Sequence, residues 1–172
     1  MKGKHLLLLL ALLIPASLFS QGVNYYYGRA VSKDYDWSEL KKADLTVYYY
    51  ARALAKDYDW SELKTASKPL YYLARAIKKD YDWSDLKKEN TTLYYYARAL
   101  VKDYDWNELK SANKTLYLFT RAIKKDYDWS DLKKENINLY YIGRSIAKDY
   151  DWSDLKKVDS IFFLYEYIKQ KN

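Results

Sequence analysis

The side chains of this chain best suited to chemistry are aspartates that occur in pairs around a tyrosine. The sequence Lys-Asp-Tyr-Asp-Trp occurs six times without a change of spacing. Two carboxylates in one short loop are typical ligands of a hard cation such as calcium. A calcium-binding loop would also need a glycine at its sixth position and a closing glutamate, where this chain has Glu39 and Leu45. The loop therefore departs from a calcium site, and we expect no cofactor.

Composition leaves little material for catalysis. The chain has one histidine, His5, in an N-terminal segment that we expect to be removed, and it has no cysteine. A histidine base, a cysteine nucleophile or a histidine metal cluster therefore cannot be built. Paired carboxylates could still hydrolyse glycosides, but the acid and the base need different environments, and near-identical copies share one environment. We expect no enzymatic activity.

A second recurring set combines tyrosine, arginine and lysine at helical spacing. Tyr95, Arg98 and Lys102 fall on one side of an expected helix, away from Leu93, and the fifth copy has Leu118 in place of the tyrosine. Tyrosine and arginine carry much of the binding energy at protein interfaces. Alternatively, each arginine pairs with an Asp-Tyr-Asp carboxylate, and the set is a ladder that only stabilises the fold. The candidate binding residues are Tyr26, Arg29, Tyr49, Arg52, Tyr72, Arg75, Tyr95, Arg98, Arg121, Tyr141 and Arg144.

The tryptophans and the remaining helical tyrosines suit a structural role. Each tryptophan precedes a leucine by three residues, as Trp37 precedes Leu40, which favours core packing over a sugar-stacking platform. Tyr94 and its equivalents lie beside the expected inner face, so we interpret them as packing between units. The tryptophans are Trp37, Trp60, Trp83, Trp106, Trp129 and Trp152, at intervals of 23 residues.

Two helices per unit would position these residues. Asn90 can cap a helix of about 11 residues whose apolar positions recur at helical spacing. The phase breaks after Lys102, and Asp105 followed by Glu108 predicts a capping box that starts a second helix of about seven residues. Small residues such as Ala97 would let neighbouring long helices approach closely. The expected caps of the long helices are Asp44, Ser67, Asn90, Asn113, Asn136 and Asp159.

These elements predict an all-α fold. A β repeat would need glycine in its turns, and none of the four glycines lies in a repeat-joining loop. We predict an α-solenoid of six 23-residue two-helix units with a C-terminal capping helix, in which residues such as Glu166 form a polar outer face. The expected units are 21–43, 44–66, 67–89, 90–112, 113–135 and 136–158, with the cap at 159–172, all within one domain, 21–172.

The repeated motifs resemble known short-period helical repeats. The order Asn-x-Thr-Leu, then Ala-x-Lys-Asp-x-Asp-Trp, is similar to the leucine-rich repeat variant family, which consists of paired short helices. Trp37 and Leu40 also resemble the opening of a tetratricopeptide repeat, although Lys41 stands where that family has glycine and the period is shorter. The resemblance implies a binding or scaffolding role through fold alone.

The N-terminus indicates export. Lys2 and Lys4 precede an apolar run, Leu6 to Ile14, which is too short for a permanent membrane span, so residues 1–20 are predicted to be a signal peptide. Without these two lysines, 28 basic residues face 23 acidic ones, interleaved rather than clustered, which argues against nucleic acid. We expect a secreted or periplasmic protein, of bacterial type, that binds an extracellular or periplasmic protein or peptide. The alternatives are glycan binding through exposed aromatic residues and a purely structural envelope protein.

Overall fold

The protein is all-helical, as the sequence predicts. The computed structural model describes residues 22–158 and 161–168, and the predicted signal peptide lies outside this range. No helix among the described residues is long and apolar enough to cross a membrane. Long and short helices alternate along the chain, and consecutive helices pack against one another. A succession of packed helix pairs is therefore confirmed.

The long helices have 11 or 12 residues and the short ones have seven, close to the lengths expected. One long helix, α7, continues through a π-helical stretch, η2. The long helices are α1 (Val23–Lys33), α3 (Leu45–Lys56), α5 (Lys68–Lys79), α7 (Thr91–Ala97) with η2 (Arg98–Lys102), α9 (Lys114–Lys125) and α11 (Ile137–Lys148). The short helices, with seven residues each, are α2 (Trp37–Ala43), α4 (Trp60–Ala66), α6 (Trp83–Glu89), α8 (Trp106–Ala112), α10 (Trp129–Glu135) and α12 (Trp152–Val158). The terminal helix α13 (Tyr165–Ile168) has four residues.

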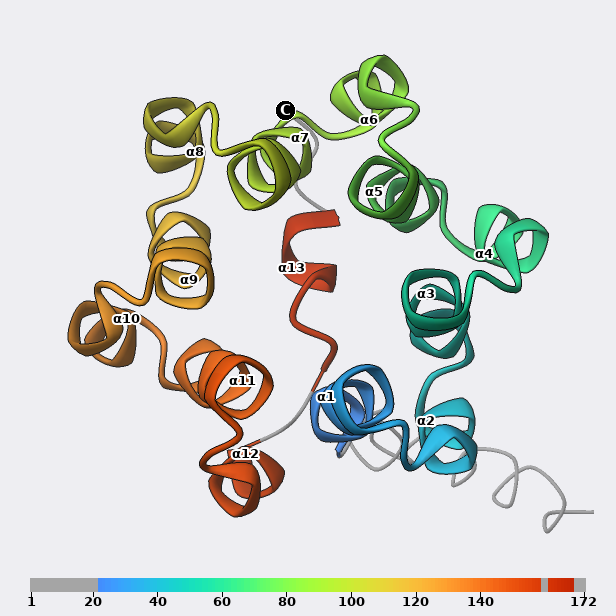
Figure 1. Ribbon diagram of the computed structural model, residues 1–172, viewed down its shortest axis with the longest axis horizontal. Coiled ribbons are helices and arrows are strands. Elements are labelled where there is room, and N and C mark those ends of the chain that lie inside the picture. Colours follow the sequence, from blue (N-terminus) through green and yellow to red (C-terminus); the bar gives the residue numbers. More distant parts are fainter. Residues whose placement is uncertain (1–21, 159–160, 169–172) are drawn as a thin grey trace, which may run out of the picture.

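The helix pairs do not form an array with two free ends, because the array closes into a ring (Figure 1). The long helices form the inner circle, the short helices form the outer one, and α1 packs against α11 and α12. At this joint, Lys33 Nζ lies 2.5 Å from Asp149 Oδ2. Trp152 packs edge-on against Tyr25, with ring centroids 6.0 Å apart. Both contacts repeat those between consecutive pairs, so each helix pair has a neighbour on both sides.

The predicted caps of the long helices are confirmed wherever the structure describes them. The Asp44 side chain accepts a hydrogen bond from the Val47 amide at 2.9 Å, and Asn90 does the same for Leu93. These bonds satisfy amides that a helix leaves free in its first turn. Ser67, Asn113 and Asn136 act likewise, whereas Asp159 lies outside the described residues.

Two sets of buried residues hold the ring together. The leucines of the short helices, Leu40 among them, are fully buried against the long helices. Small residues such as Ala51 and Ala53 are also fully buried, which confirms that small flanks let the long helices approach closely. Tyr27 and Tyr50 lie further in, and burial raises the pKa of both phenols.

The C-terminal segment differs from the expected cap. It lies inside the ring rather than over an exposed end (Figure 1). Phe162, Leu164 and Tyr167 are buried there, and the Phe162 ring packs against Tyr27 at 5.1 Å and Tyr50 at 5.9 Å between centroids. A closed ring has no end to cover, so the apolar side chains of this segment fill the centre instead. The prediction that this segment caps an exposed end with a polar outer face is therefore wrong.

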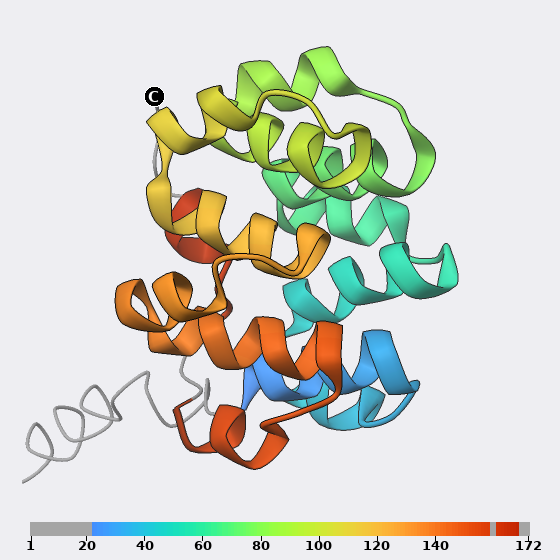
Figure 2. The same cartoon turned by 60° about the vertical axis from the view of Figure 1, so that its left-hand side comes forward.

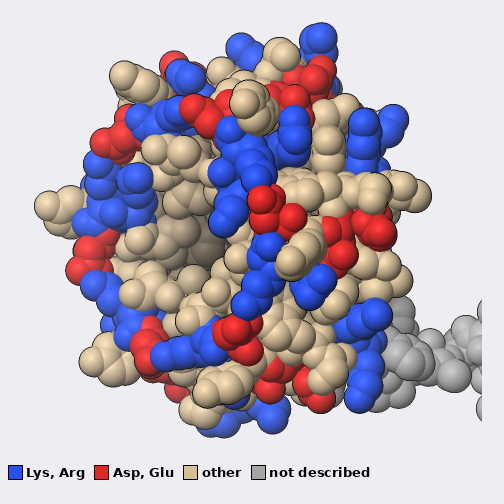
Figure 3. Space-filling view, turned by 45° about the vertical axis from the view of Figure 1, so that its right-hand side comes forward, with Lys and Arg blue, Asp and Glu red and all other residues tan. Residues whose placement is uncertain are grey.

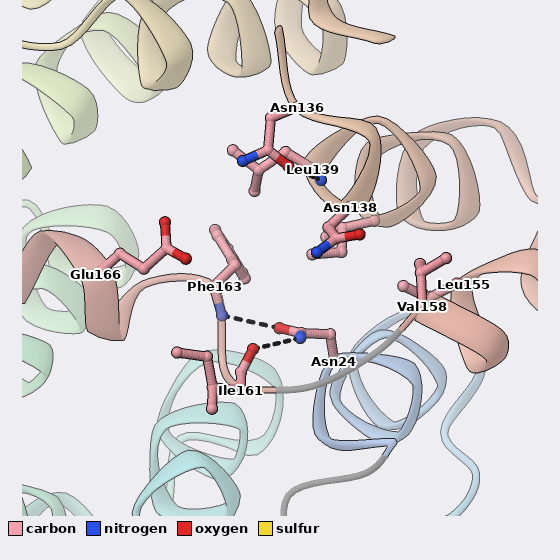
Figure 4. A pocket seen from close by; sticks show the side chains of 10 residues that line it. Asn24, Asn136, Asn138, Leu139, Leu155, Val158, Ile161, Phe163 and Glu166 are labelled. Carbon is pink, nitrogen blue, oxygen red and sulfur yellow. Dashed lines mark hydrogen bonds between the residues drawn. The ribbon is translucent and has the colours of Figure 1, made fainter. Parts of the chain in front are cut away.

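Asn24 connects the C-terminal segment to α1. The corresponding residue of the other long helices is aliphatic, Val47 in α3 for example, but Asn24 is just as buried. Its amide donates to the Ile161 carbonyl at 2.6 Å and accepts from the Phe163 amide at 2.9 Å (Figure 4). One departure from the repeated pattern thus satisfies two backbone groups of the central segment, of which the Phe163 amide is buried.

Candidate functional site: the tyrosine face of the ring

The loops from long to short helices carry the most exposed aromatic side chains of the described chain. In each loop both aspartates have left-handed backbone, with φ between 62° and 65°. Aspartate tolerates this conformation better than most residues. The two left-handed residues turn the tyrosine between them toward solvent. These loop tyrosines, 60–62% exposed, are Tyr35, Tyr58, Tyr81, Tyr104, Tyr127 and Tyr150.

The arginines of the predicted binding set lie beneath the loop tyrosines. Arg52 Cζ is 5.1 Å from the Tyr58 ring centroid and 5.7 Å from that of Tyr48. Its Nε donates to Asp59 at 2.9 Å. In all six pairs the arginine faces the same two rings and the same carboxylate. The arginine therefore supports the loop tyrosine from one side.

The predicted capping box of the short helices is wrong. Asp59 precedes α4 but makes no side-chain cap bond, and the same holds for its equivalents in the first five loops. Asp59 has left-handed backbone, and its carboxylate pairs with Arg52 instead of capping the helix. The arginine ladder that the sequence left open is thus present in the structure.

The other aspartate of each loop joins neighbouring helix pairs. Asp57 accepts from the Trp60 indole at 2.9 Å and from Lys79 of the next pair at 2.5 Å. Both bonds lower the pKa of the Asp57 carboxyl below its usual value, and the bond from Lys79 has the larger effect. Six such lysine pairs, at 2.5–2.7 Å, run around the ring and include the closing pair. Both aspartates of each loop are therefore engaged with side chains of the protein.

The tryptophans and the inner tyrosines pack as the sequence predicts. Trp60 is half-buried against the core and meets the Tyr71 ring edge-on, 6.2 Å between centroids. Tyr71 belongs to the next pair, so the contact links units. Lys64 lies over the Tyr71 ring at 5.4 Å, on the same side chain that Arg75 approaches. These aromatic residues hold the joints between pairs.

The tyrosines of the predicted binding set are half-buried rather than exposed. Tyr72 packs edge-on against Tyr71, with centroids 5.3 Å apart. Leu118, in the equivalent place on α9, is only 7% exposed. The predicted arginine Arg75 faces the Tyr71 and Tyr81 rings, and both it and Lys79 are paired with aspartates. The loop tyrosines, which were not predicted, are the most exposed aromatic residues.

Sequence reasoning missed the loop tyrosines because Tyr104 fits the apolar phase of the preceding helix. The signal was the pair of aspartates around it. Both can adopt left-handed backbone, and the first of them ends the helix before the tyrosine.

The face that carries the loops is hollowed at its centre. Figure 3 shows a depression lined by uncharged side chains and bordered by alternating basic and acidic ones. Figure 2 shows the long-to-short loops on one side of the ring and α13 toward the other. The C-terminal segment thus fills one half of the centre and leaves the loop side open.

Other features of the described residues offer less for a ligand. A cavity of about 30 Å³ beside Asn24 and Phe163 has room for water only (Figure 4). Among residues 22–158 and 161–168, no group of three or more histidine, cysteine, aspartate or glutamate side chains could hold a metal ion.

Comparison with known proteins gives no relative. The chain matches no protein-family model, and no curated protein or solved structure is significantly similar to it. The likeness to leucine-rich repeat variant and tetratricopeptide repeats therefore remains a general one of paired helices.

Proposed function

We propose that this chain is an exported, noncatalytic binding protein that uses its six loop tyrosines to contact an extracellular or periplasmic protein or peptide. Residues 1–20 would be its signal peptide, and the six 23-residue units would each supply one tyrosine. The observation that carries the proposal is the equal exposure of these six tyrosines, 60–62%, at equivalent places on one ring. Exposed aromatic side chains on a fixed scaffold are well suited to recognition.

The arginine beneath each loop tyrosine favours the loop tyrosines as the contact surface over the tyrosines, arginines and lysines predicted on the long helices. Arg75 contacts the Tyr81 ring at 5.4 Å and is itself fixed by Asp82 at 2.8 Å. A side chain already held in place loses little conformational freedom when a partner binds. The arginines thus contribute as a platform, while the tyrosines provide the contact area.

The charge of the loop face restricts the partner. Each loop region pairs its two carboxylates with cations, as Asp82 pairs with Arg75 and Asp80 with Lys102. The carboxylates cancel the positive charge that a phosphate backbone would need. A partner without strong charge, contacted at several tyrosines at once, fits this face. Multiple contacts of this kind strengthen binding without any single strong one.

Site-specific photo-crosslinking in the producing cell tests the proposal. A benzoylphenylalanine in place of Tyr81 should capture one defined protein, whereas the same group in place of Lys88, exposed at the far end of α6, should not. The purified partner should then lose at least about tenfold in affinity when Tyr58, Tyr81 and Tyr104 are changed to serine. Equal capture from both positions, or an affinity indifferent to the triple substitution, would contradict the proposal.

A glycan is the second candidate, because one side of each loop tyrosine carries an arginine while the side chain remains largely exposed. An uncovered aromatic face can stack on a sugar ring. This alternative predicts that soluble polysaccharides quench tyrosine emission of the wild type but not of a variant with all six loop tyrosines changed to serine. Quenching that survives the six changes would exclude the loop tyrosines as a sugar site.

A further inference from the structure

The depression at the centre of the loop face is surrounded by the inward side of the long helices (Figures 1 and 3). Tyr50 and Leu54, about one turn apart, lie on this side of α3. The position of Leu54 is nearer the loops, and it is aliphatic and half-buried in every long helix. These wall residues are Val31, Leu54, Ile77, Leu100, Ile123 and Ile146. The wall of the depression is therefore apolar all round.

Three phenols lie about one turn deeper than this wall. The position of Tyr50 is also tyrosine in α1 and α7, as Tyr27 and Tyr96, and it is apolar in the other long helices. Tyr27 is 7% exposed, Tyr50 is 2% exposed and Tyr96 is 5% exposed. Burial raises the pKa of Tyr50, and so do the nearby Tyr27 and Tyr96 phenols. The three hydroxyls therefore share one region of the centre.

These three hydroxyls have no hydrogen-bond partner among residues 22–158 and 161–168, although buried polar groups are normally bonded. The side-chain atoms of the described chain that are both enclosed and unpartnered are Arg121 Nε and Ser145 Oγ, so the phenol oxygens still touch accessible space. The C-terminal segment covers the other side of the centre (Figure 2). We infer that the accessible space is the depression on the loop side.

The depression favours an uncharged ligand. The inward positions of the wall and of the phenols hold no charged residue in any long helix. Burial also raises the pKa of Tyr27 and Tyr96, so all three phenols are neutral and can each donate or accept a hydrogen bond. A charged group would lose water here without gaining a counter-ion. An apolar body with one uncharged polar group suits both the wall and the phenols.

We propose that the central depression is a binding site for a small uncharged ligand with an apolar body and a hydroxyl or carbonyl group. The body would pack against the aliphatic wall, and the polar group would hydrogen-bond to Tyr27, Tyr50 or Tyr96. This site goes beyond the proposed contact at the loop tyrosines and does not depend on it, because it uses the centre of the ring and not the loops.

Methyl NMR and equilibrium binding with p-cresol test the site. The probe should shift the methyl signals of wall residues such as Ile77 and Leu100 in a saturable way. The methyl signals of Leu86, which is buried beneath a short helix, should not move. Toluene has the same shape without the hydroxyl and should bind at least about tenfold more weakly, the usual effect of one hydrogen bond. The charged analogue p-toluate should not bind.

The triple variant Tyr27→Phe, Tyr50→Phe and Tyr96→Phe removes the hydroxyls and keeps the rings. It should fold, as a thermal melt will check, because these hydroxyls bond to no described residue and α9 has Phe119 at the same place. It should bind p-cresol and toluene with equal affinity. A second variant, Leu54→Trp, fills the depression without changing a phenol and should abolish binding of both probes.

Serine substitution of three loop tyrosines, Tyr58, Tyr81 and Tyr104, is the matched control and should leave the preference for p-cresol unchanged. Absence of wall shifts in the wild type would overturn the proposal, and so would equal affinity for p-cresol and toluene. A preference that survives in the folded phenylalanine variant, or undiminished binding to a folded Leu54→Trp protein, would place the ligand elsewhere and would overturn it too.

Discussion

The joints between neighbouring helix pairs, which form the rim of the ring, consist of repeated contacts, whereas the centre of the ring consists of contacts that occur once. At the rim, the same polar and aromatic contacts occur at every joint, and the closing pair of Lys33 with Asp149 has the same 2.5 Å distance as the pair of Lys79 with Asp57. In the centre, the segment around Phe162 makes contacts that occur once, against rings contributed by different helices. Repetition therefore defines the angle between neighbours, while a unique apolar segment fills the space that this angle encloses.

The comparison predicts that stability depends more on the centre than on any one joint. Phe162 is fully buried and touches Tyr27, Tyr50 and Phe163. Phe162→Ala should cost about 3–5 kcal/mol of unfolding free energy, the usual result of deleting a buried aromatic ring. Urea unfolding followed by tryptophan emission measures it. A loss below about 1 kcal/mol would mean that the ring stands without its central segment.

The tryptophans test whether the closing joint equals the others. Trp152→Ala removes the contact with Tyr25 across the joint, and Trp83→Ala removes the same contact with Tyr94 inside the array. Each should cost about 2–3 kcal/mol, less than full burial would give, because both side chains are half-buried. Paired urea titrations compare them. A Trp152 variant as stable as the wild type would indicate a joint that is open in solution.

Asn24 tests the polar connection between rim and centre. Asn24→Leu introduces the side chain type found at this place in other long helices, but it leaves the Ile161 carbonyl and the Phe163 amide without their partner. The buried Phe163 amide, left without a partner, should lower the free energy of unfolding by about 1–3 kcal/mol. Val47→Leu, at the equivalent place in α3, is the control and should be nearly neutral. A stabilised Asn24→Leu protein would show that packing outweighs these two bonds.

The sequence predicts the rim better than the centre. The caps at Asp44 and Asn90 and the packing of Trp60 follow from local spacing, and all are found. Closure could not be predicted, because it depends on a small rotation per pair that adds up over the ring. The inward path of the C-terminal segment follows from closure, since only a ring offers a centre to fill. The capping box failed because aspartate can cap a helix or adopt left-handed backbone, and Arg52 with Asp59 favours the latter.

The smallest effect is expected from a single rim ion pair. Lys33→Met leaves the Asp149 carboxylate without its lysine, and Lys79→Met does the same to Asp57 within the array. Exposed pairs contribute little and are screened by salt, so each change should lower the Tm by at most about 2 °C, and the difference should vanish near 1 M salt.

Acid should weaken all six rim pairs together. Lysine and tryptophan hydrogen bonds hold the pKa of Asp149 and of its equivalents, such as Asp57, below the usual value, so the folded state binds protons less readily than the unfolded one. The rim contribution is therefore complete above the usual aspartate pKa of about 3.9 and is lost as the pH falls through the lowered value. Melting curves between neutral pH and pH 2 should show this loss.

A zero-length carbodiimide should also join Lys33 to Asp149 as readily as Lys79 to Asp57. An array that is open in solution would give only the second crosslink, and Lys33→Met would then leave its Tm unchanged.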